Sequence, residues 1–215
     1  EIAGGQVRSA RASGTMFRGF ERLLHGRDPM DALVIMCRIC GQCGAAHSGT
    51  AARALADAFG AEPPPNGVLS SAIIRAAELL LSHVAHFCFT FAADLCALPG
   101  KEHLAERFAP IRGTSFRRAL VARRALLGLM GLFAGKWPNT LAMHPGGATR
   151  PVTRSELIRC RGLLAEFERF VEESLLGCSI ERWLENGSLA DLDEWLGQGT
   201  HAESDLGLFV RTALD

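Results

Sequence analysis

The longest regular segment of the sequence covers residues 69–98 and reads LSSAIIRAAELLLSHVAHFCFTFAADLCAL. Its apolar residues recur at spacings of three and four, which is the period of a helix with one buried face. Pro99 and Gly100 follow directly and favour the end of a helix. The spacing therefore predicts one long helix over 69–98. The proline-rich residues 62–67 before it predict a loop that cannot be helical.

Helical spacing extends to both sides of this segment. The other helices that it predicts cover 16–24, a short segment from Pro29, an Ala-rich segment 50–59 ended by Gly60, 101–108, 116–133, 156–176 and 189–196. The helix over 156–176 begins with a capping box formed by Thr153 and Glu156. Residues 1–12 alternate loosely and predict one or two short strands. The sequence therefore predicts a mainly α fold with a small N-terminal β edge, and we interpret 1–215 as a single domain.

Composition excludes several classes of function. The chain has 215 residues, of which 48% are hydrophobic and 21% charged, so it can bury a core of ordinary size. Its 23 basic and 23 acidic residues balance, which argues against a nucleic-acid-binding protein and a polybasic membrane anchor. No run of about 18 uncharged apolar residues occurs, so we expect no direct membrane span. The chain does not begin with Met or with a signal peptide. It could be a fragment, or the parent protein could lack the missing second cysteine pair described below.

The seven cysteines occupy positions 37, 40, 43, 88, 96, 160 and 178. An odd number is not typical of the disulfide framework of a small secreted protein, so a reducing compartment fits better. Cys88, Cys96, Cys160 and Cys178 stand alone in apolar or helical surroundings, and we expect them to be buried.

Cys40 and Cys43 form a Cys-x-x-Cys turn within the segment RICGQCGAAH, residues 38–47. Such a turn brings two sulfurs close enough to chelate one soft metal or to form a disulfide. A zinc site would need a second pair of ligands at matching distance, and a thioredoxin-like pair would need a βαβ context; the sequence has neither. The spacing alone leaves metal binding, redox chemistry and structural burial open.

The segment with Cys40, Cys43 and His47 resembles the N-terminal cysteine motif of the large subunit of nickel-iron hydrogenases. Other motifs match the same family in the same order: GTMFRGFE from Gly14, GRDP from Gly26, Asp31-Ala32, Pro64-Pro65-Asn66, His83-x-x-His86-Phe87, GKWP from Gly135 and HPGG from His144. The resemblance is strong over 13–150. It implies a helical hydrogenase large-subunit fold, present here only in part.

The resemblance also implies a site. Cys40 and Cys43 match two of four thiolates that hold a NiFe(CN)2CO centre, Cys43 being the one that bridges nickel and iron. His47 matches a histidine that hydrogen-bonds a cysteine sulfur, and Glu21 matches a carboxylate near a magnesium ion. Arg38 could supply a fixed positive charge near the anionic centre, although a surface ion pair is nearly as good an explanation. For His83 and His86 the favoured interpretation is satisfied core histidines on an inward helix face.

Two departures from the family pattern bear on function. The family's second Cys-x-x-Cys is absent from these 215 residues, and Leu81-Ser82 replaces the usual His-Asp before His83. The resemblance still implies heterolytic oxidation or sensing of H2, with electrons passed to an iron-sulfur small subunit. The alternative is a non-catalytic maturation scaffold that holds the iron-cyanide-carbonyl precursor. The implied partners are the small subunit and maturation proteins, and the implied location is the cytoplasm or the membrane through the partner subunit.

Overall fold

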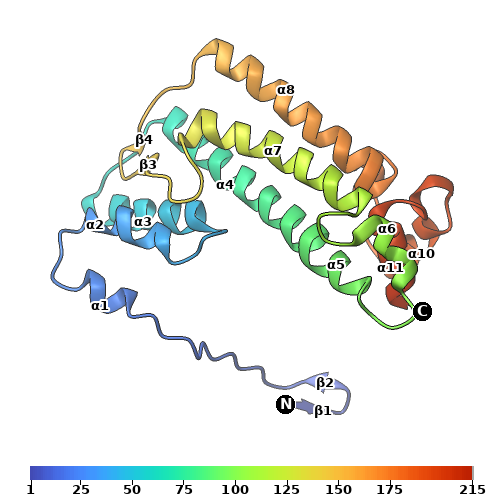
Figure 1. Cartoon of the computed structure of the whole chain (residues 1–215). Coiled ribbons are helices and arrows are strands. Elements are labelled where there is room, and N and C mark those ends of the chain that lie inside the picture. The colour runs from blue at the N-terminus through green and yellow to red at the C-terminus, as the bar shows by residue number, and fades with distance from the viewer. Residues whose placement is uncertain (215) are drawn as a thin grey trace.

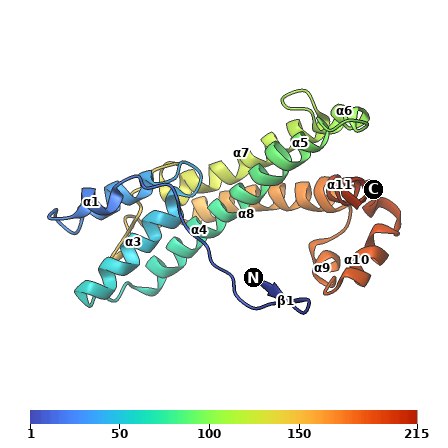
Figure 2. The same cartoon turned by 90° about the horizontal axis from the view of Figure 1, so that it is seen from below.

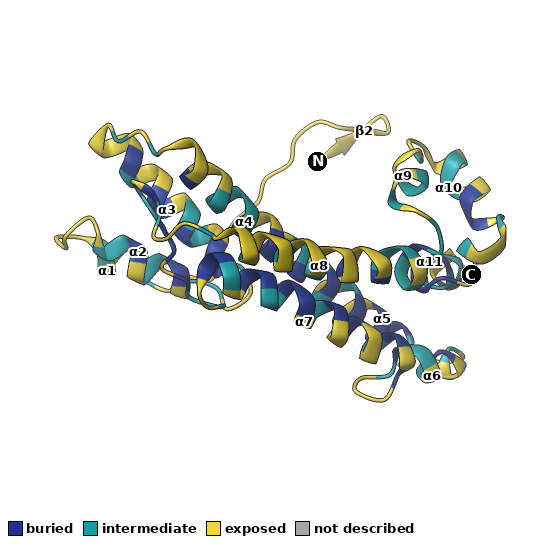
Figure 3. Ribbon diagram, turned by 90° about the horizontal axis from the view of Figure 1, so that it is seen from above, coloured by how far each residue is buried: buried dark blue, intermediate teal, exposed yellow. Residues whose placement is uncertain are grey.

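Three long helices form the body of the molecule in the computed structural model, which describes residues 1–214 (Figures 1 and 2). They are α4 (Pro65–His86), α7 (Thr114–Ala134) and α8 (Arg154–Phe170). Helix α7 packs against both α4 and α8 along its length. The facing sides of these helices carry the buried residues and their outer sides are exposed, as Figure 3 shows. The main core therefore lies along α7.

One end of the bundle carries the segment with the cysteine turn. Helix α2 (Asp31–Ile35) leads through a 3-10 turn (Met36–Arg38) to α3 (Gly44–Phe59). The hairpin of β3 (Met143–His144) and β4 (Gly147–Ala148) lies against α3 and the start of α4. A Cβ added to Gly67 of α4 would lie 2.9 Å from Cα of Gly147, so the hairpin and α4 approach closely because both residues are glycine.

The other end is built from short helices. The α4 helix continues through a π-helix (Phe87–Phe91) into α5 (Ala92–Leu95), and a 3-10 turn (Glu102–Leu104) leads to α6 (Ala105–Phe108). After α8 come a π-helix (Val171–Leu176), α9 (Ile180–Leu184), α10 (Leu189–Leu196), a 3-10 turn (Gly199–His201) and α11 (Asp205–Leu214). Buried Asp205 pairs with Arg107 and accepts a hydrogen bond from Ser115, which joins α11, α6 and α7.

The N-terminal arm makes little contact with the bundle. Strands β1 (Ile2–Ala3) and β2 (Gln6–Val7) pair antiparallel, and residues 1–18 are all exposed (Figures 1 and 3). Helix α1 (Phe20–Leu24) follows the arm. The predicted N-terminal β edge is confirmed. The predicted helix over 16–24 is too long, because Gly19 has a φ of 76° and the helix begins only after it.

Most helix predictions are confirmed, but several of their bounds need correction. The helix over 189–196 and the capping box at Thr153 match the structure. Residues 62–67 are not all loop, because Pro65 occupies the first helical position, where a missing N–H does no harm. The predicted single helix over 69–98 is a continuous helical stretch over Pro65–Leu95, with a π-helical segment at Phe87–Phe91, and it ends before residue 98. The rings of Phe87 and Phe91 lie 5.2 and 6.4 Å from the ring of Phe209, centroid to centroid. The hairpin β3–β4 and helices α9 and α11 were not predicted.

That the chain has no direct membrane span stays a prediction. By length and composition alone, the helical stretch Pro65–Leu95 is long and apolar enough to cross a membrane, with a mean hydropathy of 1.5 over its most apolar window. This criterion is also met by core helices of soluble proteins. Here Ile74, Leu81 and Val84 of the stretch are buried in the same core cluster as residues of α3 and α7.

Candidate metal site

Cys40 and Cys43 lie in the turn between the Met36–Arg38 segment and α3. Their sulfurs are joined as a disulfide, with the Cα atoms 5.3 Å apart. The backbone N–H of Cys43 donates a hydrogen bond to Sγ of Cys40 at 3.1 Å. Both residues are partly buried. The sulfurs therefore converge, which both a disulfide and a two-thiolate chelate of one metal require.

Glu78 of α4 holds the start of α3, directly after the cysteine turn. Its side chain is only 2% exposed. The carboxylate accepts hydrogen bonds from the backbone N–H groups of Ala45 and Ala46 at 2.8 and 2.7 Å. It also accepts one from the indole N–H of Trp137 at 2.9 Å. Sequence analysis did not single out Glu78, because a glutamate in a helical pattern has the same signature as a solvated charge.

The loop of residues 135–140, which carries Trp137, packs against α3 and α7 near Glu78. Thr140 is fully buried and donates a hydrogen bond to the Ala134 carbonyl at 2.8 Å. The backbone carbonyl of Thr140 accepts a hydrogen bond from Ser48 of α3 at 3.4 Å. The Arg123 guanidinium lies over the Trp137 ring, 5.1 Å from its centroid. These contacts tie the 135–140 loop to α3 and α7.

Gly44 packs closely against two backbone segments. A Cβ added there would lie 2.9 Å from the backbone oxygen of Cys37 and 3.5 Å from the backbone nitrogen of Asn139. Both neighbours are backbone atoms, which cannot rotate away as the end of a side chain can. The residue after Cys43 must therefore be small for the turn to sit against these two segments.

The remaining predicted site residues lie farther from the sulfurs or point elsewhere. Arg38 is exposed and donates to the carbonyl of Val34 and, at 3.4 Å, to the sulfur of Cys37. This places its charge against the preceding helical turn. His47 lies in the first turn of α3, where its backbone N–H donates to the Cys43 carbonyl at 3.2 Å, and it is partly exposed. No hydrogen bond within residues 1–214 joins its ring to a cysteine sulfur.

Glu21, His83 and His86 are the other polar residues considered from the sequence, and all three are exposed. Glu21 is exposed on α1. Within the described part of the chain, no group of three or more His, Cys, Asp or Glu side chains could hold a metal, so Glu21 has no magnesium cluster around it. The prediction that His83 and His86 are core histidines is wrong, since both are exposed. The inward face of α4 is occupied instead by Leu81 and Val84, which are buried.

The isolated cysteines differ in burial. Cys88 is buried as expected, whereas Cys96, Cys160 and Cys178 are only partly buried, which corrects the prediction for these three. Burial and, secondarily, the negative charge of Asp205 raise the pKa of the Cys88 thiol to about 12. Burial also raises the pKa of the Cys160 thiol. Burial therefore disfavours the thiolate form of both side chains.

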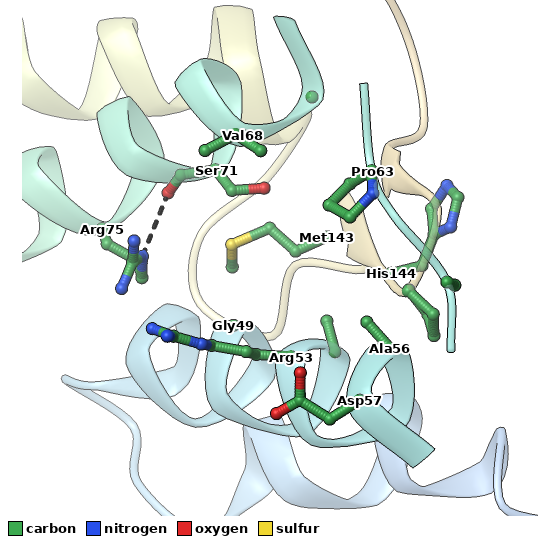
Figure 4. Close-up of a pocket in the computed structure, with 15 residues that line it drawn as sticks. Gly49, Arg53, Ala56, Asp57, Pro63, Val68, Ser71, Arg75, Met143 and His144 are labelled. Carbon is green, nitrogen blue, oxygen red and sulfur yellow. Dashed lines mark hydrogen bonds between the residues drawn. The ribbon is translucent and has the colours of Figure 1, made fainter. Parts of the chain in front are cut away.

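A separate cavity of about 370 Å³ lies between α3, the start of α4 and the β3–β4 hairpin (Figure 4). Arg53 and Asp57 enter it from α3, Ser71 and Arg75 from α4, and Met143 from the hairpin. Arg75 donates to the backbone carbonyl of Ser71 at 3.4 Å. The lining residues do not include Cys40 or Cys43, so this cavity is distinct from the cysteine turn.

The region around the cysteine turn is similar to a known protein family. Residues 18–98, which contain both cysteines and Glu78, match the family model described as nickel-dependent hydrogenase. The chain is 33% identical over 195 residues to the periplasmic [NiFeSe] hydrogenase large subunit of Desulfomicrobium baculatum. The chain belongs to the nickel-iron hydrogenase large-subunit family and corresponds to the N-terminal part of its members. The resemblance inferred from the sequence motifs is thereby confirmed.

The chain is also similar to a second relative and to a solved structure. The Escherichia coli K12 hydrogenase-2 large chain is 42% identical over 94 residues, which are 44% of this chain and 17% of that relative. The Ni-Fe-Se hydrogenase structure from D. vulgaris Hildenborough superposes with a TM-score of 0.66 at 35% identity, over 80% of this chain and 38% of the other. The Desulfomicrobium match covers 82% of this chain and 38% of the relative. The chain thus spans well under half the length of these relatives.

Proposed function

We propose that this chain is the N-terminal part of a nickel-iron hydrogenase large subunit, in which Cys40 and Cys43 hold the metal centre. The observation that carries the proposal is the convergence of the two sulfurs, in a turn fixed by buried Glu78, inside the region that matches the hydrogenase family. Once reduced, the two sulfurs are soft thiolate donors, which fit nickel and iron. They are two donors, and in this proposal the other ligands come from outside these 215 residues.

When bound, a NiFe(CN)2CO centre supplies the heterolytic cleavage of H2. The chain's own residues would bind and shield it. Cys40 and Cys43 would ligate the metal centre. The Cys43 N–H donates to the Cys40 sulfur and would so tune the donor strength of that sulfur. Cys37 and Ala45 are both fully buried beside the turn and exclude water on its inner side.

Partners and location follow from the same proposal. Several relatives are named large subunits or large chains, and the proposed partner is an iron-sulfur small subunit that takes the electrons. Maturation proteins would insert the centre. We propose a location in the cytoplasm or at the membrane through the small subunit; the relatives include proteins named periplasmic and uptake hydrogenases. Glu21 remains our proposal for a magnesium ligand, which would need partners beyond the described residues.

The test is metal content and activity of the assembled large and small subunits. We expect Cys40→Ser and Cys43→Ser to abolish nickel retention and hydrogen-dependent dye reduction. The matched control is Cys178→Ser, since Cys178 is also partly buried but lies near Trp195, whose indole N–H donates to its sulfur at 3.3 Å. Full nickel content in both site variants would contradict the proposal. Iron with cyanide infrared bands, but no nickel and no dye reduction in the unmodified protein, would favour the maturation scaffold instead.

A further inference from the structure

We propose that Glu78 is the positioning residue of the Cys40–Cys43 pair, an inference that rests on the proposed function for its metal-binding consequence. Through the start of α3 and the Trp137 loop, its carboxylate fixes the backbone from which Cys43 presents its sulfur. Glu78 itself contacts neither sulfur in the hydrogen bonds of the described residues.

The surroundings of Glu78 are unusual for a carboxylate. It is 2% exposed, and no ion pair within residues 1–214 neutralises it. A buried charge without a cation is costly unless hydrogen bonds replace its hydration. Its two oxygens are met by three N–H donors, two of them at the N-terminus of α3, where the helix dipole favours negative charge. The position is therefore stabilised only while α3 and Trp137 stay in place.

The capping of α3 explains why such a residue is needed. Cys43 is the residue at the N-cap position of α3, and its side chain makes no capping hydrogen bond. At α8 the equivalent task is done locally, since the Thr153 side chain accepts from the backbone N–H of Glu156. The first N–H groups of α3 therefore need an acceptor other than the Cys43 side chain. Glu78, 33 residues after Ala45 in sequence, accepts the N–H of Ala45 in place of a local cap and leaves the Cys43 sulfur free to meet Cys40.

The contacts around Glu78 leave the turn little freedom. Ala45, which donates to Glu78, is two residues after Cys43 and fully buried. Gly44 between them is confined by the backbone of Cys37. The indole N–H of Trp137 donates to the same carboxylate oxygen as the N–H of Ala45. Loss of Glu78 would release α3 and the loop together, and the two sulfurs would converge less often.

The experiment uses the 215-residue chain and two readouts. The first is Co²⁺ binding to the reduced chain, followed by the thiolate-to-cobalt charge-transfer absorption. The second is the equilibrium between the open dithiol and the Cys40–Cys43 disulfide in glutathione buffers, which reports how often the sulfurs meet and needs no metal. We expect Glu78→Ala to weaken Co²⁺ binding about 10-fold or more. The same variant should shift the glutathione equilibrium several-fold toward the dithiol.

Two further variants should change both readouts less than Glu78→Ala does. Glu78→Gln keeps one oxygen acceptor and should recover part of both readouts. Trp137→Phe removes a single donor to Glu78 while keeping an aromatic ring, and should shift both readouts less than Glu78→Ala. The matched control is Glu156→Gln, which removes a helix-capping carboxylate from α8 and should leave both readouts unchanged.

The outcomes separate this inference from the proposed function. Unchanged readouts in a folded Glu78→Ala variant would overturn the inference and leave metal binding intact. An unmodified chain that binds no Co²⁺, together with a shifted glutathione equilibrium in Glu78→Ala, would support positioning and count against the metal site. If Glu78→Ala does not fold, Trp137→Phe decides: shifted readouts support the inference and unchanged ones overturn it.

Discussion

Glu78 and Asp205 are both buried carboxylates of this molecule, but their partners differ in kind. Asp205 is paired with a cation, Arg107, and with the hydroxyl of Ser115. Glu78 has no cation and accepts only N–H groups, two of them from the first turn of a helix. The contacts of Asp205 join three helices far from the cysteine turn. The contacts of Glu78 fix the start of α3, directly after that turn. Burial alone therefore does not indicate the role of a carboxylate. The groups that donate hydrogen bonds to it indicate which part of the structure it holds in place.

Removing the ion pair at the far end should have the largest effect on stability. Asp205→Ala leaves the partly buried Arg107 without its anion, and we expect the free energy of unfolding to fall by about 3 kcal/mol. Urea denaturation followed by circular dichroism measures the change. Co²⁺ binding by the cysteine pair should stay within error, because Asp205 contacts neither the turn nor α3. A loss below about 1 kcal/mol would show that Asp205 is no more than a surface-like charge.

A substitution beside the turn should cost less stability but change the site. In Gly44→Ala the new Cβ would lie 2.9 Å from the Cys37 oxygen, so the backbone must shift. We expect a loss of about 2 kcal/mol in the free energy of unfolding, the cost of overpacking. Co²⁺ binding should weaken as well, in contrast to Asp205→Ala. The matched control is Gly131→Ala on α7, where no atom lies within 4 Å of an added Cβ. Equal Co²⁺ affinity in both glycine variants would contradict the tight packing of the turn.

The smallest effect concerns Glu156, an exposed carboxylate that also caps a helix. Hydrogen bonds from the backbone N–H and the hydroxyl of Thr153, and then Arg150, lower the pKa of Glu156 from 4.5 to about 2. A lowered pKa means that the carboxylate stabilises the fold above pH 4.5 and loses this contribution as the pH falls toward 2. The stability difference between the unmodified chain and Glu156→Gln should therefore shrink over that interval. Thermal unfolding between pH 5 and pH 2 measures it, and a constant difference would disagree with this capping role.

Prediction from sequence succeeded where the signal is local. The capping box at Thr153, the helix end at Gly60 and the helix over 189–196 each depend on residues a few positions apart. It failed for the start of α3, which begins at Gly44 and not at residue 50, because Ala45 and Ala46 are held by a residue of another helix. It failed for His83 and His86 because helical period alone does not say which face of α4 turns inward.

The sequence by itself determined the helical class, the cysteine turn and the family, since these follow from local spacing and from motifs in a fixed order. Only the tertiary structure decided that Glu78 lies under that turn and that Trp137 donates to it. These contacts join residues 33 and 59 positions apart. No local pattern encodes such a pairing, because which donors meet a carboxylate depends on how helices and loops pack together.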